Sequence, residues 1–245
     1  MLEPCINQAD GLQSLSAKQT PKLVAVASHG QQQGELPLLW SLCNAWVEMG
    51  FSVMVLDGHS QDSDSNPGLQ QILTNPTGRL HDQQEALSWS VLPAARGFEQ
   101  FTRQGFNSHT VGHLFQNYDV VLIYADATTL SGLLKDSGLA PLVVVAPLKA
   151  SSLTAYQALK QLLLDARLHP TVANIAMLPH VKKYMPSSAQ NLQDCAMTFL
   201  GLAIKPITVS ATTNAGDSQD EVNRLALRLL EEAVSLEHSP TERTH

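Results

Sequence analysis

Short apolar runs rich in β-branched residues alternate with longer amphipathic segments along most of the chain. Near-continuous apolar strands separated by helices are typical of a parallel sheet that is covered on both faces. We therefore expect an α/β fold of three layers, in which helices cover both faces of a mostly parallel, twisted sheet. The predicted strands are 22–28, 51–57, 89–92, 119–124, 140–146, 172–178 and 204–209.

Helical spacing and capping residues predict where two of the helices begin and end. The first runs from Leu38 to Met49 and is closed by Gly50, which suits the left-handed position after a helix. Either Ser151 or Ser152 is expected to cap a long helix that ends at about Leu168. The apolar face of this second helix carries Leu159, Leu162, Leu163 and Ala166.

A capping box, Ser-Gln-Asp-Glu at 218–221, predicts a final helix that ends at about Leu236. A membrane-surface helix has a basic polar face, whereas Glu231, Glu232 and Glu237 make this one acidic. We therefore expect the helix to pack against the sheet. Its apolar stripe consists of Val222, Leu225, Ala226, Leu229, Leu230 and Ala233.

Both ends of the chain are polar and differ from the central part. We expect residues 1–20 to form a mobile N-terminal tail that ends at the turn signal Thr20-Pro21. Residues 21–237 are expected to form one α/β domain, and residues 238–245 a disordered tail. The polar segment 59–67 is expected to be a flexible loop at the carboxyl end of the second strand, where such folds bind ligands.

Composition and charge exclude several classes of protein. A net charge of −7 argues against a nucleic-acid partner. The three cysteines are widely spaced and odd in number, and no signal peptide is recognisable, so we expect a reducing, cytoplasmic location. No apolar run reaches the roughly 18 residues that a membrane span needs, so we expect no stable membrane insertion.

The segment 27–37 stands where a phosphate-binding loop belongs, between the first strand and the first helix. Such a loop uses glycine N–H groups and a Lys to bind phosphate, and a Ser or Thr to hold Mg²⁺. Here Glu35 occupies the Lys position, and Leu36 and Pro37 occupy the hydroxyl positions. Because a carboxylate repels phosphate, we expect a turn without a ligand. Residual anion binding at the helix N-terminus is the alternative.

The acidic residues of this region have structural interpretations. We expect the Glu35 carboxylate to satisfy the positive end of the following helix, with Pro37 at the first helical position. The second strand ends on Asp57, and we expect neighbouring backbone N–H groups to hold its side chain.

Four histidines are candidates for metal binding. His29 and His59 are expected to lie near each other beside Asp57, and two imidazoles with a carboxylate could bind zinc. His109 and His113 stand four residues apart and could chelate as well. Solvated side chains are the favoured interpretation of both pairs, and we expect no metal.

The chain resembles the MinD/ParA family of deviant Walker ATPases over residues 22–236, which implies a fold like that of P-loop NTPases. In the family's loop, Gly-Lys-Gly-Gly-x-Gly-Lys-Thr-Thr, the signature Lys falls on Gly30 and the phosphate-binding Lys on Glu35. The acid that ends the Walker B strand falls on Tyr124. The resemblance therefore implies a vestigial nucleotide pocket formed by Gly30, Gln31, Gln32, Gln33, Gly34, Glu35, Leu36, Asp57, His59 and Tyr124.

One branch of the family, the flagellar-number regulator FlhG (also called FleN), carries the motif Asp-Gln-Ala-x-x-Leu-Arg near its N-terminus. The segment Asn7-Gln8-Ala9-Asp10-Gly11-Leu12-Gln13 is similar to it. In that branch the motif binds the GTPase FlhF and stimulates GTP hydrolysis. The resemblance implies that an FlhF-like GTPase contacts Gln8, Ala9, Leu12 and Gln13.

These resemblances imply a pseudo-ATPase: a non-catalytic MinD/FlhG-like regulator or scaffold in flagellar number and placement. It would act through flagellar or polar-assembly proteins, without ATP or Mg²⁺ as cofactor, in the cytoplasm or at a cell pole to which a partner recruits it. Three alternatives stay open. The chain could be a degenerate MinD/ParA-like localisation protein of a pilus or polar system, it could be an atypical weak ATP-binding ATPase, or its tail could have no partner.

Overall fold

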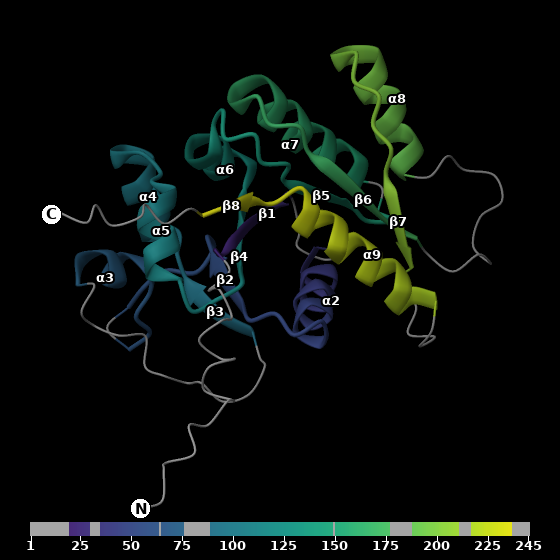
Figure 1. Cartoon of the computed structure of the whole chain (residues 1–245). Helices are drawn as coiled ribbons and strands as arrows, with labels where there is room; N and C mark the ends of the chain where they lie inside the picture. The colour runs from purple at the N-terminus through teal and green to yellow at the C-terminus, as the bar shows by residue number, and fades with distance from the viewer. Residues whose placement is uncertain are drawn as a thin grey trace, which may run out of the picture.

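A computed structural model describes residues 20–29, 35–63, 65–75, 89–148, 150–176, 188–210 and 217–236, which form a sheet with helices on both faces (Figure 1). The strands are β1 (Lys22–Ser28), β2 (Val53–Asp57), β3 (Trp89–Pro93), β4 (Val120–Asp126), β5 (Leu142–Val145), β6 (Thr171–Ala176), β7 (Ile207–Ser210) and β8 (Val234–Ser235). The helices are α2 (Glu35–Glu48), α3 (Leu69–Thr74), α4 (Ala95–Gln104), α5 (Ser108–Leu114), α6 (Ala127–Leu134), α7 (Ser151–Ala166), α8 (Ser188–Leu200) and α9 (Asp217–Glu231).

The sheet confirms the predicted fold class. Its strand order is β3-β2-β4-β1-β5-β6-β7, every pair along this path is parallel, and β8 adds to β1. All seven predicted strands are present, and most of their ends shift by one to three residues. Of the predicted tails 1–20 and 238–245, residues 1–19 and 238–245 lie outside the described residues, as does the loop 30–34.

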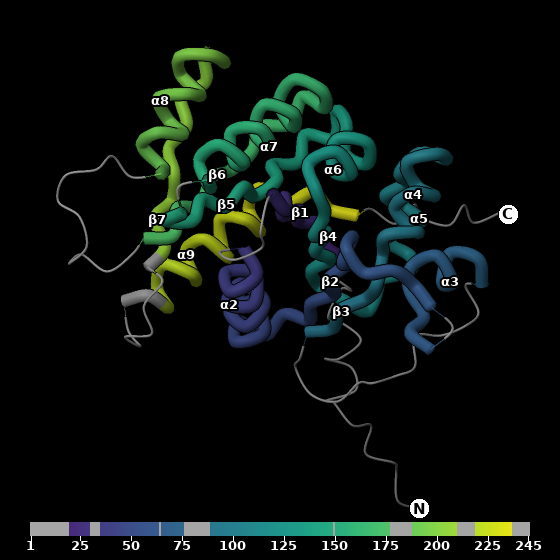
Figure 2. The backbone as a smooth tube through the Cα atoms, turned by 180° about the vertical axis from the view of Figure 1, so that it is seen from behind, coloured from purple at the N-terminus to yellow at the C-terminus, as the bar shows by residue number. Residues whose placement is uncertain are grey.

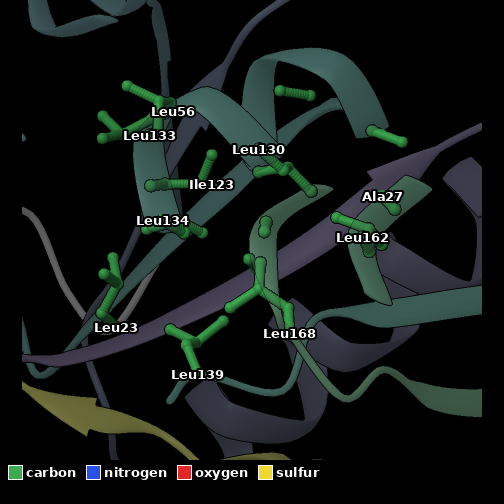
Figure 3. Packing of buried hydrophobic residues seen from close by; sticks show 14 of the residues in the cluster. Leu23, Ala27, Leu56, Ile123, Leu130, Leu133, Leu134, Leu139, Leu162 and Leu168 are labelled. Carbon is green, nitrogen blue, oxygen red and sulfur yellow. The ribbon is translucent and has the colours of Figure 1, made fainter. Parts of the chain in front are cut away.

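Two apolar cores flank the sheet because its strands are buried on both faces. One core packs α2 and α9 against alternate residues of the central strands. The opposite core contains residues of the other helices, and Figure 3 shows how leucines of α6 and α7 meet the sheet around Ile123. Figures 1 and 2 show α2 and α9 side by side below β1 and β5, with α6 and α7 above.

The N-terminal ends of two predicted helices need correction. Helix α2 begins at Glu35, so Pro37 is its third residue rather than its first. Helix α7 begins at Ser151 after Ala150, and no side chain caps it. The Ser151 hydroxyl instead accepts a hydrogen bond from the backbone N–H of Ala146 at 2.8 Å, which ties the helix start to the end of β5.

The C-terminal ends of these two helices follow the prediction more closely. Gly50 follows α2 with a φ of 89°, in the left-handed region that glycine adopts without strain. Helix α7 ends at Ala166, because Arg167 takes a left-handed conformation with a φ of 57°. Leu163 of the predicted apolar face is only half-buried.

The final helix is shorter than predicted. Helix α9 begins at Asp217, so Ser218 lies inside it rather than at a capping position, and it ends at Glu231. The next residues form β8, which pairs antiparallel with the first two residues of β1. Leu236 is fully buried, and its backbone N–H donates to the Pro21 carbonyl at 2.8 Å. The helix ends before these residues because residues 234 and 235 pair with β1 and Leu236 is buried beside them.

The predicted stripe of α9 faces the core. Val222, Leu225, Ala226, Leu229 and Leu230 are buried, and Ala233 packs against them. This confirms that the helix packs on the sheet. None of the helices in the described part of the chain is both long and apolar enough to cross a membrane.

The burial of Leu236 yields a test of this C-terminal segment. Leu236→Ala is expected to lower the free energy of unfolding by about 2–5 kcal/mol, because it leaves a cavity beside α5 and β1. The matched variant Leu227→Ala removes the same atoms from a side chain that is 50% exposed, and it should change stability by about 0.5 kcal/mol or less. Urea denaturation measures both. Equal losses in the two variants would contradict the placement of β8.

Candidate functional site

The candidate site lies at the carboxyl ends of three adjacent strands. Tyr124 of β4 pairs with Val26 of β1 on one side and with Asp57 of β2 on the other. Ser28 and His29 continue from the end of β1. In open parallel sheets this edge is where ligands bind, because the strand ends and the following helix starts converge there.

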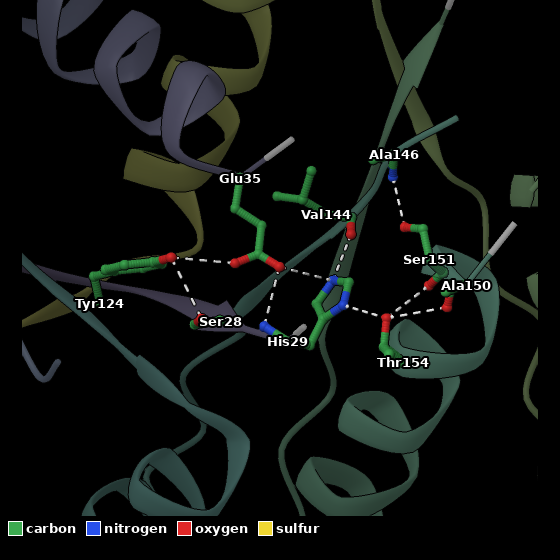
Figure 4. A network of polar contacts seen from close by, with 9 residues as sticks. All are labelled: Ser28, His29, Glu35, Tyr124, Val144, Ala146, Ala150, Ser151 and Thr154. Atoms are coloured by element: carbon green, nitrogen blue, oxygen red, sulfur yellow. Dashed lines mark hydrogen bonds and ion pairs between the residues drawn. The ribbon is translucent and has the colours of Figure 1, made fainter. Parts of the chain in front are cut away.

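Glu35 is the centre of a buried polar network (Figure 4). Its side chain is only 5% exposed, although it is the first residue of α2. One carboxylate oxygen, Oε1, accepts a hydrogen bond from the backbone N–H of His29 at 3.0 Å. The other, Oε2, accepts one from the Tyr124 hydroxyl at 3.2 Å. The carboxylate thus fastens the start of α2 to the ends of β1 and β4.

This geometry corrects the expected role of Glu35. We expected its carboxylate to satisfy the N–H groups at the start of α2. The donors that the structure shows come instead from His29 and Tyr124, on the two strands. Because Glu35 is itself the first helical residue, its side chain reaches back toward the sheet edge rather than along its own helix.

His29 extends the network toward α7. Its Nε2 lies 2.5 Å from the Val144 carbonyl, and because a carbonyl oxygen can only accept, Nε2 must carry the hydrogen. Its Nδ1 lies 3.0 Å from the Thr154 hydroxyl oxygen. Nε2 is also 3.6 Å from Oε1 of Glu35. One imidazole therefore links α2, β5 and α7.

Tyr124 supplies a neutral donor where the resemblance implies an acid. Burial raises the pKa of its hydroxyl from 10.0 to about 12; the hydrogen bond with Ser28 opposes this rise, and the Glu35 carboxylate adds to it. The hydroxyl therefore stays protonated at neutral pH and donates to Glu35. A neutral phenol cannot supply the anionic oxygen that magnesium sites favour.

Asp57 and His59 lie beside this network and have local partners. As expected, a neighbouring backbone N–H, that of His59, donates to Asp57 Oδ1 at 3.0 Å, and the Ser60 hydroxyl donates to Oδ2 at 2.5 Å. The exposed His59 ring packs edge-on against Tyr124, with the ring centroids 5.1 Å apart. Asp57 is therefore held within its own turn.

Two further side chains at this edge were not predicted. Asp126 caps α6 by accepting hydrogen bonds from the backbone N–H and the hydroxyl of Thr129, both at 2.9 Å. Burial opposes its ionisation, but these bonds outweigh it and lower the pKa of Asp126. Thr154 holds the ring of His29, 125 positions away in the sequence. No local pattern signals a contact between residues so far apart.

The histidine pairs do not form metal sites in the described part of the chain. His29 turns toward Val144 and Thr154, while His59 packs on Tyr124. Across the described ranges, no group of three or more His, Cys, Asp or Glu side chains could hold a metal ion. His109 and His113 are exposed on α5.

The remaining predicted site residues fall into two groups. Leu36 is partly buried and packs against the core beneath α2. The loop residues Gly30, Gln31, Gln32, Gln33 and Gly34 and the tail residues Gln8, Ala9, Leu12 and Gln13 lie outside the described residues.

Comparison with protein-family models and with curated proteins gave no match. Solved structures do match. One chain of the MinC:MinD cell division protein complex of Aquifex aeolicus is 16% identical to this chain. The match covers 89% of this chain and 99% of that one, with a TM-score of 0.56. A plasmid partition protein from Borrelia burgdorferi is 12% identical over 86% of this chain and 99% of its own, with a TM-score of 0.53.

A third similar structure is the cobyrinic acid a,c-diamide synthase of Mycobacterium smegmatis with bound ADP and magnesium. It is 16% identical over 88% of this chain and 98% of its own, with a TM-score of 0.53. At these identities the likeness shows the fold alone. The chain has the fold of MinD/ParA-type P-loop NTPases, as the sequence resemblance implied.

The buried Glu35 network can be tested by substitution. Glu35→Ala removes the acceptor of the His29 N–H and of the Tyr124 hydroxyl, so the free energy of unfolding should fall by about 1–3 kcal/mol. Glu99→Ala is the matched control, because that side chain is 66% exposed on α4. Chemical denaturation measures both variants. Because the substitution also removes the buried negative charge beside the start of α2, inorganic phosphate should raise the melting temperature of Glu35→Ala and not that of the wild type. An unchanged stability of Glu35→Ala would contradict this account.

Proposed function

We propose that this chain is a non-catalytic regulator or scaffold of the MinD/FlhG type, which acts in flagellar number and placement by binding partner proteins. Its fold is that of MinD and of plasmid partition proteins. The observation that supports a non-catalytic role is the buried Glu35 carboxylate, held by His29 and Tyr124 at the strand ends.

The energetics of this carboxylate argue against nucleotide binding. The resemblance sets Glu35 in the place of the phosphate-binding Lys. Loss of a charged hydrogen bond to phosphate costs about 1.5–3 kcal/mol. Replacement by a negative group adds repulsion, which for two like charges 4 Å apart near a protein surface is about 4 kcal/mol. A phosphate would also have to separate Glu35 from donors that satisfy it.

The second candidate function is that of a MinD/ParA-like localisation protein in a pilus or another polar system. The structural likeness to a plasmid partition protein favours it as much as it favours the flagellar system. Both candidates use the same fold and the same network. They differ in the partner, which we place at the N-terminal tail for the flagellar system.

Calorimetric titration with Mg-ATP tests the loss of nucleotide binding. We expect no heat of binding at micromolar nucleotide, because Glu35 and Tyr124 replace the cationic and the acidic group that the resemblance assigns to these positions. The M. smegmatis synthase is a suitable positive control, since its structure holds ADP and magnesium. Micromolar affinity for Mg-ATP would overturn the pseudo-ATPase proposal and favour the weak ATPase.

GTP turnover by an FlhF-type GTPase tests the proposed partner. Leu12→Asp in the full chain should abolish binding, because a charge would enter an apolar groove. Gln8→Ala should preserve binding and reduce stimulation, since Gln8 is expected to project toward the active site of the partner. If the wild-type chain at high micromolar concentration neither binds nor stimulates the GTPase, the flagellar proposal fails and the localisation protein remains.

A further inference from the structure

Two tryptophans form an exposed apolar surface on the flank of α2 and the adjoining edge of the sheet. The rings of Trp40 and Trp89 meet edge to face with centroids 4.9 Å apart. The Trp89 indole N–H also donates to the Asn44 side chain at 3.0 Å. Trp40 is 58% exposed and Val91 is 53% exposed. We call these four residues the tryptophan patch.

The patch is exposed because the helical layer ends there. Strand β3 is the edge of the sheet, and in the described ranges only α2 and α9 cover the face on which the patch lies (Figures 1 and 2). Trp89 and Val91 are two residues apart and therefore point to the same face. The hydrogen bond to Asn44 and the contact with Trp40 already hold the Trp89 ring in place. Such fixed aromatic side chains lose little conformational entropy on binding, which is typical of interface hot spots.

Backbone chemistry and net charge disfavour two occupants of the patch. An added strand would have to pair with the outward-facing backbone groups of the edge strand β3. The backbone N–H of Ala94 donates inward to the Asp57 carbonyl, so the neighbouring position 93 faces outward. That position is a proline, which has no N–H to donate. A second copy of the chain is also disfavoured, because each copy carries a net charge of −7 and two copies repel each other. An apolar helix face remains as the occupant that fits.

The chain itself supplies such a segment close to the patch. Lys22, the first residue of β1, stands in one register row with Val120, Val53 and Trp89 across four neighbouring strands. Three strand spacings of about 4.8 Å separate Lys22 from Trp89 by roughly 14 Å. Residues 16–21 can span up to about 20 Å when extended. The segment 5–15 is therefore within reach of the patch.

The sequence of that segment fits a helix laid on the patch. Apolar residues recur at intervals of three, at Ile6, Ala9, Leu12 and Leu15. The segment contains no basic residue, since the first one in the chain is Lys18. Eleven helical residues measure about 16 Å, comparable to the distance from Lys22 to Trp89. We propose that residues 5–15 dock on the tryptophan patch of the same chain as a short amphipathic helix that completes the helical layer over β3.

This docking gives the tail a regulatory role. The proposed GTPase contact and the intramolecular contact use the same residue, Leu12, so they exclude each other. Because the connection through residues 16–21 is short, the tail has an effective concentration near the patch in roughly the millimolar range. A partner must outcompete this contact, so the patch acts as an autoinhibitory site for the motif.

Tryptophan fluorescence of the full chain tests the proposal without any partner. Of the three tryptophans, Trp46 is fully buried and donates to the Ala226 carbonyl, so acrylamide reports mainly on the patch. Leu12→Asp is expected to increase quenching and to shift the emission to longer wavelength, because the docked helix leaves the indoles. Ser14→Asp is the matched control: it adds the same charge on the side of the helix that faces away from Leu12, and it should behave like the wild type.

A second measurement uses tryptic cleavage after Lys18. Trp40→Ser should speed this cleavage as Leu12→Asp does, whereas the exposed control Leu227→Ser on α9 should not. Identical quenching in the wild type, Leu12→Asp and Ser14→Asp would overturn the proposal. Quenching that depends on protein concentration would also overturn it, because the tail would then bind another copy. If the fluorescence changes as expected and GTPase binding fails, only the flagellar partner is excluded.

Discussion

The buried Glu35 carboxylate constrains the whole edge of the sheet at which the strands end. A buried carboxylate costs several kcal/mol unless donors surround it, so each of its oxygens needs a partner. The His29 N–H and the Tyr124 hydroxyl provide these partners, and the His29 ring adds a third contact at 3.6 Å. The start of α2, the ends of β1 and β4 and, through Thr154, the start of α7 are held by one anion.

The same arrangement satisfies the charged and polar groups at this edge of the sheet from within the protein. In a site that binds phosphate, the ligand neutralises the cations and N–H groups around it. Here the negative charge belongs to a protein carboxylate, and the two groups that donate to it, the His29 backbone N–H and the Tyr124 hydroxyl, are neutral. The high pKa of Tyr124, about 12, keeps its proton available to Glu35 throughout the physiological range. Each oxygen of the Glu35 carboxylate thus has a donor from the protein itself.

Local patterns predicted the parallel sheet well, because apolar runs and turn residues act within a few positions. They failed where contacts between residues far apart in the sequence determine the structure. The two-residue strand β8 pairs with Lys22 and Leu23, more than 200 positions earlier, so a helical pattern extended through it to Leu236. At the site, the positions of Glu35 and Tyr124 were predicted through the family resemblance. The partners of Glu35 and the contact between His29 and Thr154 were not, since both depend on how strand ends meet in space.

The pairing of β8 with β1 also bears on the order in which the protein folds during synthesis. β1 lies at the centre of the sheet, yet the first part of this strand gains its second neighbour only from residues 234 and 235. The Lys22 amine likewise donates to the carbonyl of Leu230 at 2.9 Å. Of the described strands, the first to leave the ribosome is therefore the last to be completed. Such long-range closure slows folding, and it leaves one edge of a central apolar strand unpaired until residues 234 and 235 have been made.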